Sequence, residues 1–99
     1  MDDPEVRRTI KRAKKLDPEA IGVLYDQNFA AIYNYFRHRV GDAMLAEDLT
    51  SQLFLKMVHA LPEFRLGEAP FRSWLFGIAR NLVADHFRKE KATAVLFLD

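Results

Sequence analysis

Two pairs of polar side chains at helical spacing are the first candidates for chemistry in this sequence. His86 and Glu90, and likewise Asp48 and Gln52, lie four residues apart, which places each pair on one face of a helix. Two ligands do not complete a metal site, and the sequence has neither an HExxH motif nor a cysteine. It has no glycine-rich phosphate loop and no distinct Ser, His and Asp set. We therefore expect no metal, no cofactor and no catalytic site.

The segment from Ala43 to Leu61 carries an unusual polar face. Its apolar positions Leu49, Leu53 and Met57 form one stripe at helical spacing. The opposite side carries Asp48, Gln52, Leu55, Lys56 and His59. An exposed leucine among polar groups is typical of a helix that docks on a partner helix, whereas the alternative is that Leu55 and Phe54 are the flank of a wide core stripe.

Basic and aromatic residues alternate in the last third of the chain. Residues 64–92 hold six basic and three acidic side chains. Cations that follow phosphates and rings that stack on unpaired bases are the usual means of holding a single nucleic-acid strand. The alternative is structural: cations near a helix C-terminus are favoured by the helix dipole, and Trp74 is expected in the core because it is in register with Leu75 and Ile78.

These residues must be positioned by helices, because no stretch alternates as a strand. Asp3, Asp17 and Asp42 are predicted N-caps, the first two followed by proline and glutamate, and Gly41 is a predicted C-cap. The predicted helices cover residues 4–16, 18–40, 43–61 and 70–91, joined by short connections and a loop at 62–69. The fold class is all-α, a short N-terminal helix followed by a three-helix bundle.

Length and charge set the domain organisation. The 99 residues, with 49% hydrophobic and 29% charged, suit one globular domain. Residues 7–15 hold six basic and no acidic side chains, and this N-terminal helix has only a thin apolar stripe, so we expect it to pack marginally. Residues 17–91 form the main domain, and 92–99 are expected to begin a linker or be a cut end. Without a signal peptide, a membrane span or cysteines, the expected location is the cytoplasm, with no membrane partner.

Three blocks of the sequence resemble a known family. LYDQNFAAIYNYFRHRVGD, AEDLTSQLFLKMVHALPEFR and FRSWLFGIARNLVADHFRK occur in this order, and together they resemble the region-2 domain of bacterial sigma factors, in the extracytoplasmic-function group. The resemblance covers residues 17 to about 91. It implies a subunit that binds RNA polymerase core enzyme and recognises and melts the −10 promoter element. It also implies a second, −35-reading domain, of which nothing follows Lys91.

The resemblance assigns two sets of site residues. The block AEDLT implies contact with the clamp helices of the largest catalytic subunit of the polymerase, through Asp48, Gln52, Leu55 and Lys56. The family often has an acid where this chain has Gln52, which removes one charge from that contact. The loop is implied to capture a flipped base of the −10 non-template strand, through Phe64, Arg65, Leu66 and Gly67. The next helix is implied to hold that strand, through Arg72, Arg80, Asn81, Asp85, Arg88 and Lys89.

Two other classes of function stay open beside this one. The chain could be an interaction module whose main partner is an anti-sigma protein that covers the same surfaces. It could also be an enzyme, although no site for one is found in the sequence. The polymerase hypothesis predicts two separate surfaces, one on the third helix for protein and one on the fourth helix for DNA.

Overall fold

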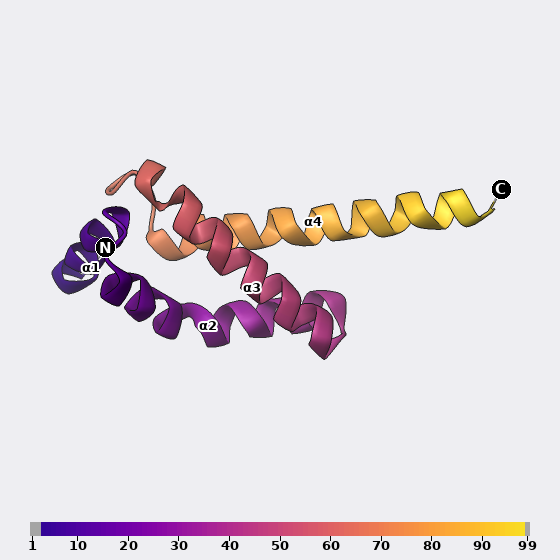
Figure 1. Ribbon diagram of the computed structural model, residues 1–99, viewed down its shortest axis with the longest axis horizontal. Helices are drawn as coiled ribbons and strands as arrows, with labels where there is room; N and C mark the ends of the chain where they lie inside the picture. Colours follow the sequence, from indigo (N-terminus) through magenta and orange to yellow (C-terminus); the bar gives the residue numbers. More distant parts are fainter. Residues whose placement is uncertain (1–2, 99) are drawn as a thin grey trace.

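The structure, a computed structural model, describes residues 3–98 as a helical bundle. Its elements are α1 (Pro4–Lys14), α2 (Pro18–Val40), α3 (Ala43–Ala60), the 3-10 turn η1 (Leu61–Glu63) and α4 (Phe71–Leu98). Helices α2, α3 and α4 pack on one another, and α1 packs against the beginning of α2 and against η1 (Figure 1). The predicted all-α fold is confirmed.

The helix ends are fixed by the residues that the sequence indicates. Asp3, Asp17 and Asp42 each use Oδ1 to accept a hydrogen bond from the backbone N–H two residues ahead, over 2.9, 3.1 and 2.9 Å. These bonds satisfy N–H groups that have no partner within the helix. At the other end of α2, Gly41 adopts a left-handed conformation with φ +71°, which a residue with a side chain rarely adopts.

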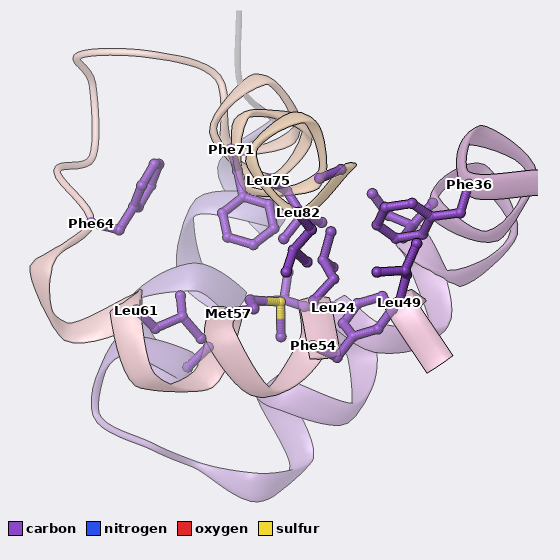
Figure 2. Close-up of a cluster of buried hydrophobic side chains, with 14 of the residues drawn as sticks. Leu24, Phe36, Leu49, Phe54, Met57, Leu61, Phe64, Phe71, Leu75 and Leu82 are labelled. Atoms are coloured by element: carbon purple, nitrogen blue, oxygen red, sulfur yellow. The ribbon is translucent and has the colours of Figure 1, made fainter. Parts of the chain in front are cut away.

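The core lies where α2, α3 and α4 meet. Leu24 and Phe36 of α2, Met57 of α3 and Leu75 of α4 are at most 1% exposed, and they point toward one another in Figure 2. Phe64 and Phe71 extend this cluster toward the loop between α3 and α4. The loop is therefore attached to the core by its aromatic side chains.

The N-terminal helix contributes more to this core than its composition indicates. Ile10 and Ala13 are fully buried, because α1 lies in the angle between α2 and η1. Leu16, the last residue of the expected helix, is instead 51% exposed. Helix α1 ends at Lys14, and Leu16 takes the left-handed conformation, φ +64°, in the turn to α2.

Helix α4 is longer than expected. It continues through the residues read as a linker and ends at Leu98. Its last turns extend beyond the bundle (Figure 1), where Leu96, Phe97 and Leu98 are 76–85% exposed. Within the described residues, no helix is both long enough and apolar enough to cross a membrane.

Candidate protein and nucleic-acid interfaces

The predicted protein-binding side chains of α3 are all exposed. Gln52 Nε2 donates to Asp48 Oδ2 over 2.9 Å, and Lys56 follows one turn later on the same side of the helix. The bond holds the amide and the carboxylate together, while Asp48 Oδ1 and Gln52 Oε1 accept no hydrogen bond within the described residues. The polar half of the predicted contact is thus arranged before any partner binds.

An apolar pair accompanies these polar residues. Leu55 is 64% exposed, whereas its neighbour Phe54 is 6% exposed and belongs to the core. The alternative in which both residues flank the core therefore holds for Phe54 and fails for Leu55. Met44 is 80% exposed and lies three helical turns before Leu55, on the same side of α3. The sequence reasoning missed Met44, although its spacing from Asp48 and Leu55 was a usable signal.

The structure brings part of the two predicted surfaces into one groove. A hollow between α3 and α4 is lined by Asp48, Gln52 and Lys56 from α3 and by Asp85 and Lys89 from α4. A neighbouring hollow between the same helices adds Asn81. The residues expected to bind polymerase and those expected to bind DNA were predicted on separate surfaces, but these six line two adjoining hollows of one groove between α3 and α4. The cause is the packing of α3 on α4, which a helix-by-helix reading does not contain.

Phe64 is not available to a base in this conformation. Its side chain is 4% exposed, and its ring centroid lies 5.5 Å from that of Phe71 and 4.9 Å from that of Trp74. Figure 2 shows the ring turned from the loop toward Phe71. Lys14 Nζ also donates to the backbone oxygen of Phe64. Both the side chain and the backbone of this residue therefore serve packing, and Trp74 joins the same cluster, as predicted.

The remaining loop residues are more accessible. Arg65 and Glu68 form an exposed ion pair, Nη1 to Oε1, over 3.4 Å, and Leu66 is partly buried against the core. Gly67 has φ +92°, a conformation that favours glycine and lets the chain turn sharply between the two ends of the loop. Of the four residues expected to capture a base, Arg65 and Gly67 are exposed.

Arg72 has a structural role that the sequence reasoning missed. Its Nε donates to Oδ1 of Asn28 over 3.0 Å, and its Nη2 donates to the backbone oxygen of Gln27 over 3.0 Å. Asn28 is 5% exposed, and its Nδ2 donates to the backbone oxygen of Leu24. The guanidinium thus attaches the first turn of α4 to the middle of α2 and satisfies a buried amide.

The exposed surface of α4, partly in the groove with α3, carries the rest of the predicted strand-binding set. All five residues are exposed: Arg80, Asn81, Asp85, Arg88 and Lys89. Arg88 is paired with Asp85, and His86 Nε2 lies 3.1 Å from Oε2 of Glu90. This surface mixes cations with carboxylates and is not uniformly positive. Across residues 3–98, no group of three or more potential metal ligands is assembled.

Comparison with known proteins identifies the family. The family model for sigma-70 region 2 matches residues 24–93. The chain is 40% identical over 90 residues to the ECF RNA polymerase sigma factor BldN of Streptomyces coelicolor, covering 91% of this chain and 34% of BldN. It is 30% identical over 86 residues to the ECF RNA polymerase sigma factor SigW of Bacillus subtilis, covering 87% of this chain and 46% of SigW. The chain therefore spans between a third and a half of the length of these relatives.

A solved structure agrees with this result. A chain in the structure of the RsbN–BldN complex superposes with a TM-score of 0.73 at 43% sequence identity. The match covers 87% of this chain and 62% of that chain. The likeness therefore extends over most of the bundle described above.

Proposed function

Because this chain belongs to the sigma-70 region 2 family, in its extracytoplasmic-function group, we propose that it binds RNA polymerase core enzyme and recognises and melts the −10 element of a promoter. Sigma factors are transcription regulators, so the enzymatic alternative gains no support from the family. The domain acts where the polymerase acts, in the bacterial cytoplasm. Its surfaces divide this work between α3, the loop after η1, and α4.

One observation supports the polymerase contact: the exposed face of α3 combines apolar and polar side chains. Leu55 and Met44 are 64% and 80% exposed beside the bonded pair of Asp48 and Gln52. Burial of these exposed apolar groups against a partner lowers the free energy of the complex, and the polar pair orients the partner. This combination suits helices that lie across α3, such as the clamp helices of the largest polymerase subunit.

The DNA contact is assigned to the exposed side of the loop and to α4. Extruding a base costs a few kcal/mol, which the site must recover by contacts with the base and the backbone. Arg65 and Gly67 provide an accessible rim for that base, with Leu66 below them, while Arg80 and Lys89 hold phosphates of the non-template strand. The formal charge of the whole chain is only +1, so the polymerase supplies most of the attraction to DNA.

The test of polymerase binding is a charge reversal at Asp48. Asp48→Arg should abolish binding to core enzyme in a pull-down or an affinity titration. The free energy of unfolding should change by less than about 0.5 kcal/mol, because the side chain is exposed. The matched control is Asp26→Arg, an exposed site on α2 whose side chain has no hydrogen bond or ion pair within the described residues. Retained binding by Asp48→Arg, or equal loss by both variants, would contradict the assignment to α3.

The DNA part is tested on the assembled complex. With core enzyme present, the protein should prefer single-stranded non-template −10 sequence to the same sequence as duplex or scrambled. Arg80→Ala should weaken all sequences alike and reduce the slope of log affinity against log salt by about 0.7. Equal affinity for all three DNA forms would reject promoter recognition.

A second function is supported by an apolar groove between α2 and α3. Its lining includes Ile21, Tyr25, Phe54, Leu55 and Val58, and Tyr25 is 42% exposed. The structural relative BldN was solved in a complex with RsbN. We propose that an anti-sigma protein can cover this groove, Leu55 included, and thereby compete with the polymerase. A protein partner that co-purifies with the chain and is displaced by core enzyme would support this proposal.

A further inference from the structure

Helix α1 carries more positive charge than the fold uses. Residues 7–15 contain six basic side chains and no acidic one. Two of the six have partners: Arg12 pairs with Asp17 over 2.8 Å and lies 3.7 Å from Glu19, and Lys14 donates to the backbone oxygen of Phe64. Within residues 3–98, no hydrogen bond or ion pair engages the side chains of the other four, which are Arg7, Arg8, Lys11 and Lys15.

Three of these four cations share one side of the helix. Arg8 and Lys11 of α1 and its C-cap residue Lys15 follow the i, i+3, i+7 spacing, which places them on one face over a length of about 10 Å. Ile10 and Ala13 are fully buried on the other side, so the packing of α1 directs the cations outward. All three are exposed.

This arrangement is unfavourable for the isolated helix. Like charges at i and i+4, such as Lys11 and Lys15, repel each other. The helix dipole favours cations in the last turn only, and Arg7 and Arg8 lie before it. A bound polyanion would remove this repulsion.

The position of α1 indicates which kind of polyanion it would bind. At its C-terminal end, Lys14 contacts the Phe64 backbone where the loop between η1 and α4 begins. In its N-terminal half, Val6 lines the same hollow as Pro70 and Arg72, where that loop ends. The two ends of α1 therefore lie near the two ends of the loop. A membrane surface does not fit, because interfacial helices need an exposed apolar face and the apolar face of α1 is buried.

We infer that α1 is an additional phosphate-binding surface, which holds the sugar-phosphate backbone of promoter DNA beside the base-capturing loop. The inference rests on the proposed function and adds a surface to it. Lys11 and Lys15 bind phosphates, and the loop reads the base. The contribution of α1 is independent of sequence, since phosphate contacts position the nucleic acid and base contacts specify it.

The experiment compares two variants that lose the same charge. Lys11→Gln/Lys15→Gln removes two cations from α1, and Arg37→Gln/Arg39→Gln removes two exposed cations from the last turn of α2. Each protein is assembled with core enzyme, and core binding is measured first. The complexes are then titrated with fluorescent single-stranded −10 oligonucleotide at several salt concentrations. A second oligonucleotide carries uncharged methylphosphonates beside the captured base.

The α1 variant should reduce the salt slope by about 1.4, as expected for two contacts to a single strand, and should weaken binding about tenfold at low salt. Its core binding and its −10 preference should be unchanged. On the methylphosphonate oligonucleotide the loss should shrink to less than about twofold, because the phosphates that Lys11 and Lys15 would bind are already neutral. The α2 variant should match the wild type on both oligonucleotides.

An unchanged slope for the α1 variant, or an equal loss in both variants, would overturn the inference while the proposed function stands. Loss of core binding by the α1 variant alone would also overturn it, because the basic face would then serve an acidic protein surface. A wild-type complex without −10 preference would reject the proposed function and this inference together.

Discussion

At the scale of single residues, Arg72 is the clearest case of a side chain whose neighbours decide its role. It was expected on the DNA strand, yet its guanidinium donates to Asn28 and to the backbone of Gln27. Arg72→Ala should lower the free energy of unfolding by about 1–3 kcal/mol, because the buried oxygen of Asn28 loses its partner. Urea unfolding measures this loss.

A double-mutant cycle separates the two roles of Arg72. In an Asn28→Ala background the further loss caused by Arg72→Ala should be clearly smaller, because the shared hydrogen bond is already absent. If Arg72→Ala alone leaves the stability unchanged but reduces the salt dependence of DNA binding, Arg72 is a DNA-binding residue as first expected.

Phe64 gives a second prediction at this scale. Because its ring packs between Phe71 and Trp74, Phe64→Ala should cost about 3–5 kcal/mol of stability. Arg65→Ala, at the exposed neighbouring position, is the control and should cost less than about 0.5 kcal/mol. Thermal melting of both variants distinguishes a packing residue from a stacking platform. A fully stable Phe64→Ala protein that has lost only DNA binding would favour the stacking platform.

At the scale of elements, the junction between α1 and α2 depends on one carboxylate. The hydrogen bond from the Arg12 side chain, followed by the backbone N–H of Glu19, holds the pKa of Asp17 below its ordinary value of 3.8, and partial desolvation opposes this shift. A carboxylate with a lowered pKa in the folded state contributes stability above its unfolded pKa, and this contribution is lost as the pH falls through the folded value. The junction should therefore weaken in acid, below about pH 4.

Asp17→Asn isolates this effect, because asparagine is an equally good N-cap but cannot form the ion pair with Arg12. The wild type should melt at a higher temperature than Asp17→Asn at pH 7, and the difference should vanish once the pH is below the folded pKa of Asp17. Melting curves of both proteins across this pH range provide the measurement. A difference that is constant with pH would show that the ion pair does not stabilise the junction.

At the scale of the whole molecule, α4 determines the shape. The radius of gyration is 15.5 Å and the extents are 55 × 24 × 23 Å, whereas a compact domain of this length has a radius of about 13 Å. The excess comes from the last turns of α4, which extend from the bundle (Figure 1). Their apolar side chains contribute little to the core.

Removal of residues 95–99 should therefore change the free energy of unfolding by less than about 0.5 kcal/mol. It should also reduce self-association, because Leu96 and Phe97 are 76% and 85% exposed and exposed apolar patches favour association. Leu82→Ala is the buried comparison on the same helix and should cost about 2–5 kcal/mol. If the truncated protein has a melting temperature as low as that of Leu82→Ala, the end of α4 packs on the bundle in solution.

The sequence alone was enough to place the beginnings of α1, α2 and α3 and the end of α2. The caps at Asp3, Asp17 and Asp42 and the stop at Gly41 act over a few residues, so local patterns located these helix ends. The face of α3 with Asp48, Gln52 and Leu55 was also visible, because helical spacing decides which residues share a side. The family resemblance drew on the same contiguous blocks.

Contacts between helices settle which side chains are free to bind. Phe64 and Arg72 are of the residue types that bind nucleic acid. However, Phe64 packs against Trp74, and Arg72 donates to Asn28, which lies 44 residues away in the sequence. Likewise, the groove that joins Asp48 to Lys89 exists only because α3 packs on α4. A residue's type and spacing show what it can bind, whereas its availability depends on contacts between distant segments, which no local pattern contains.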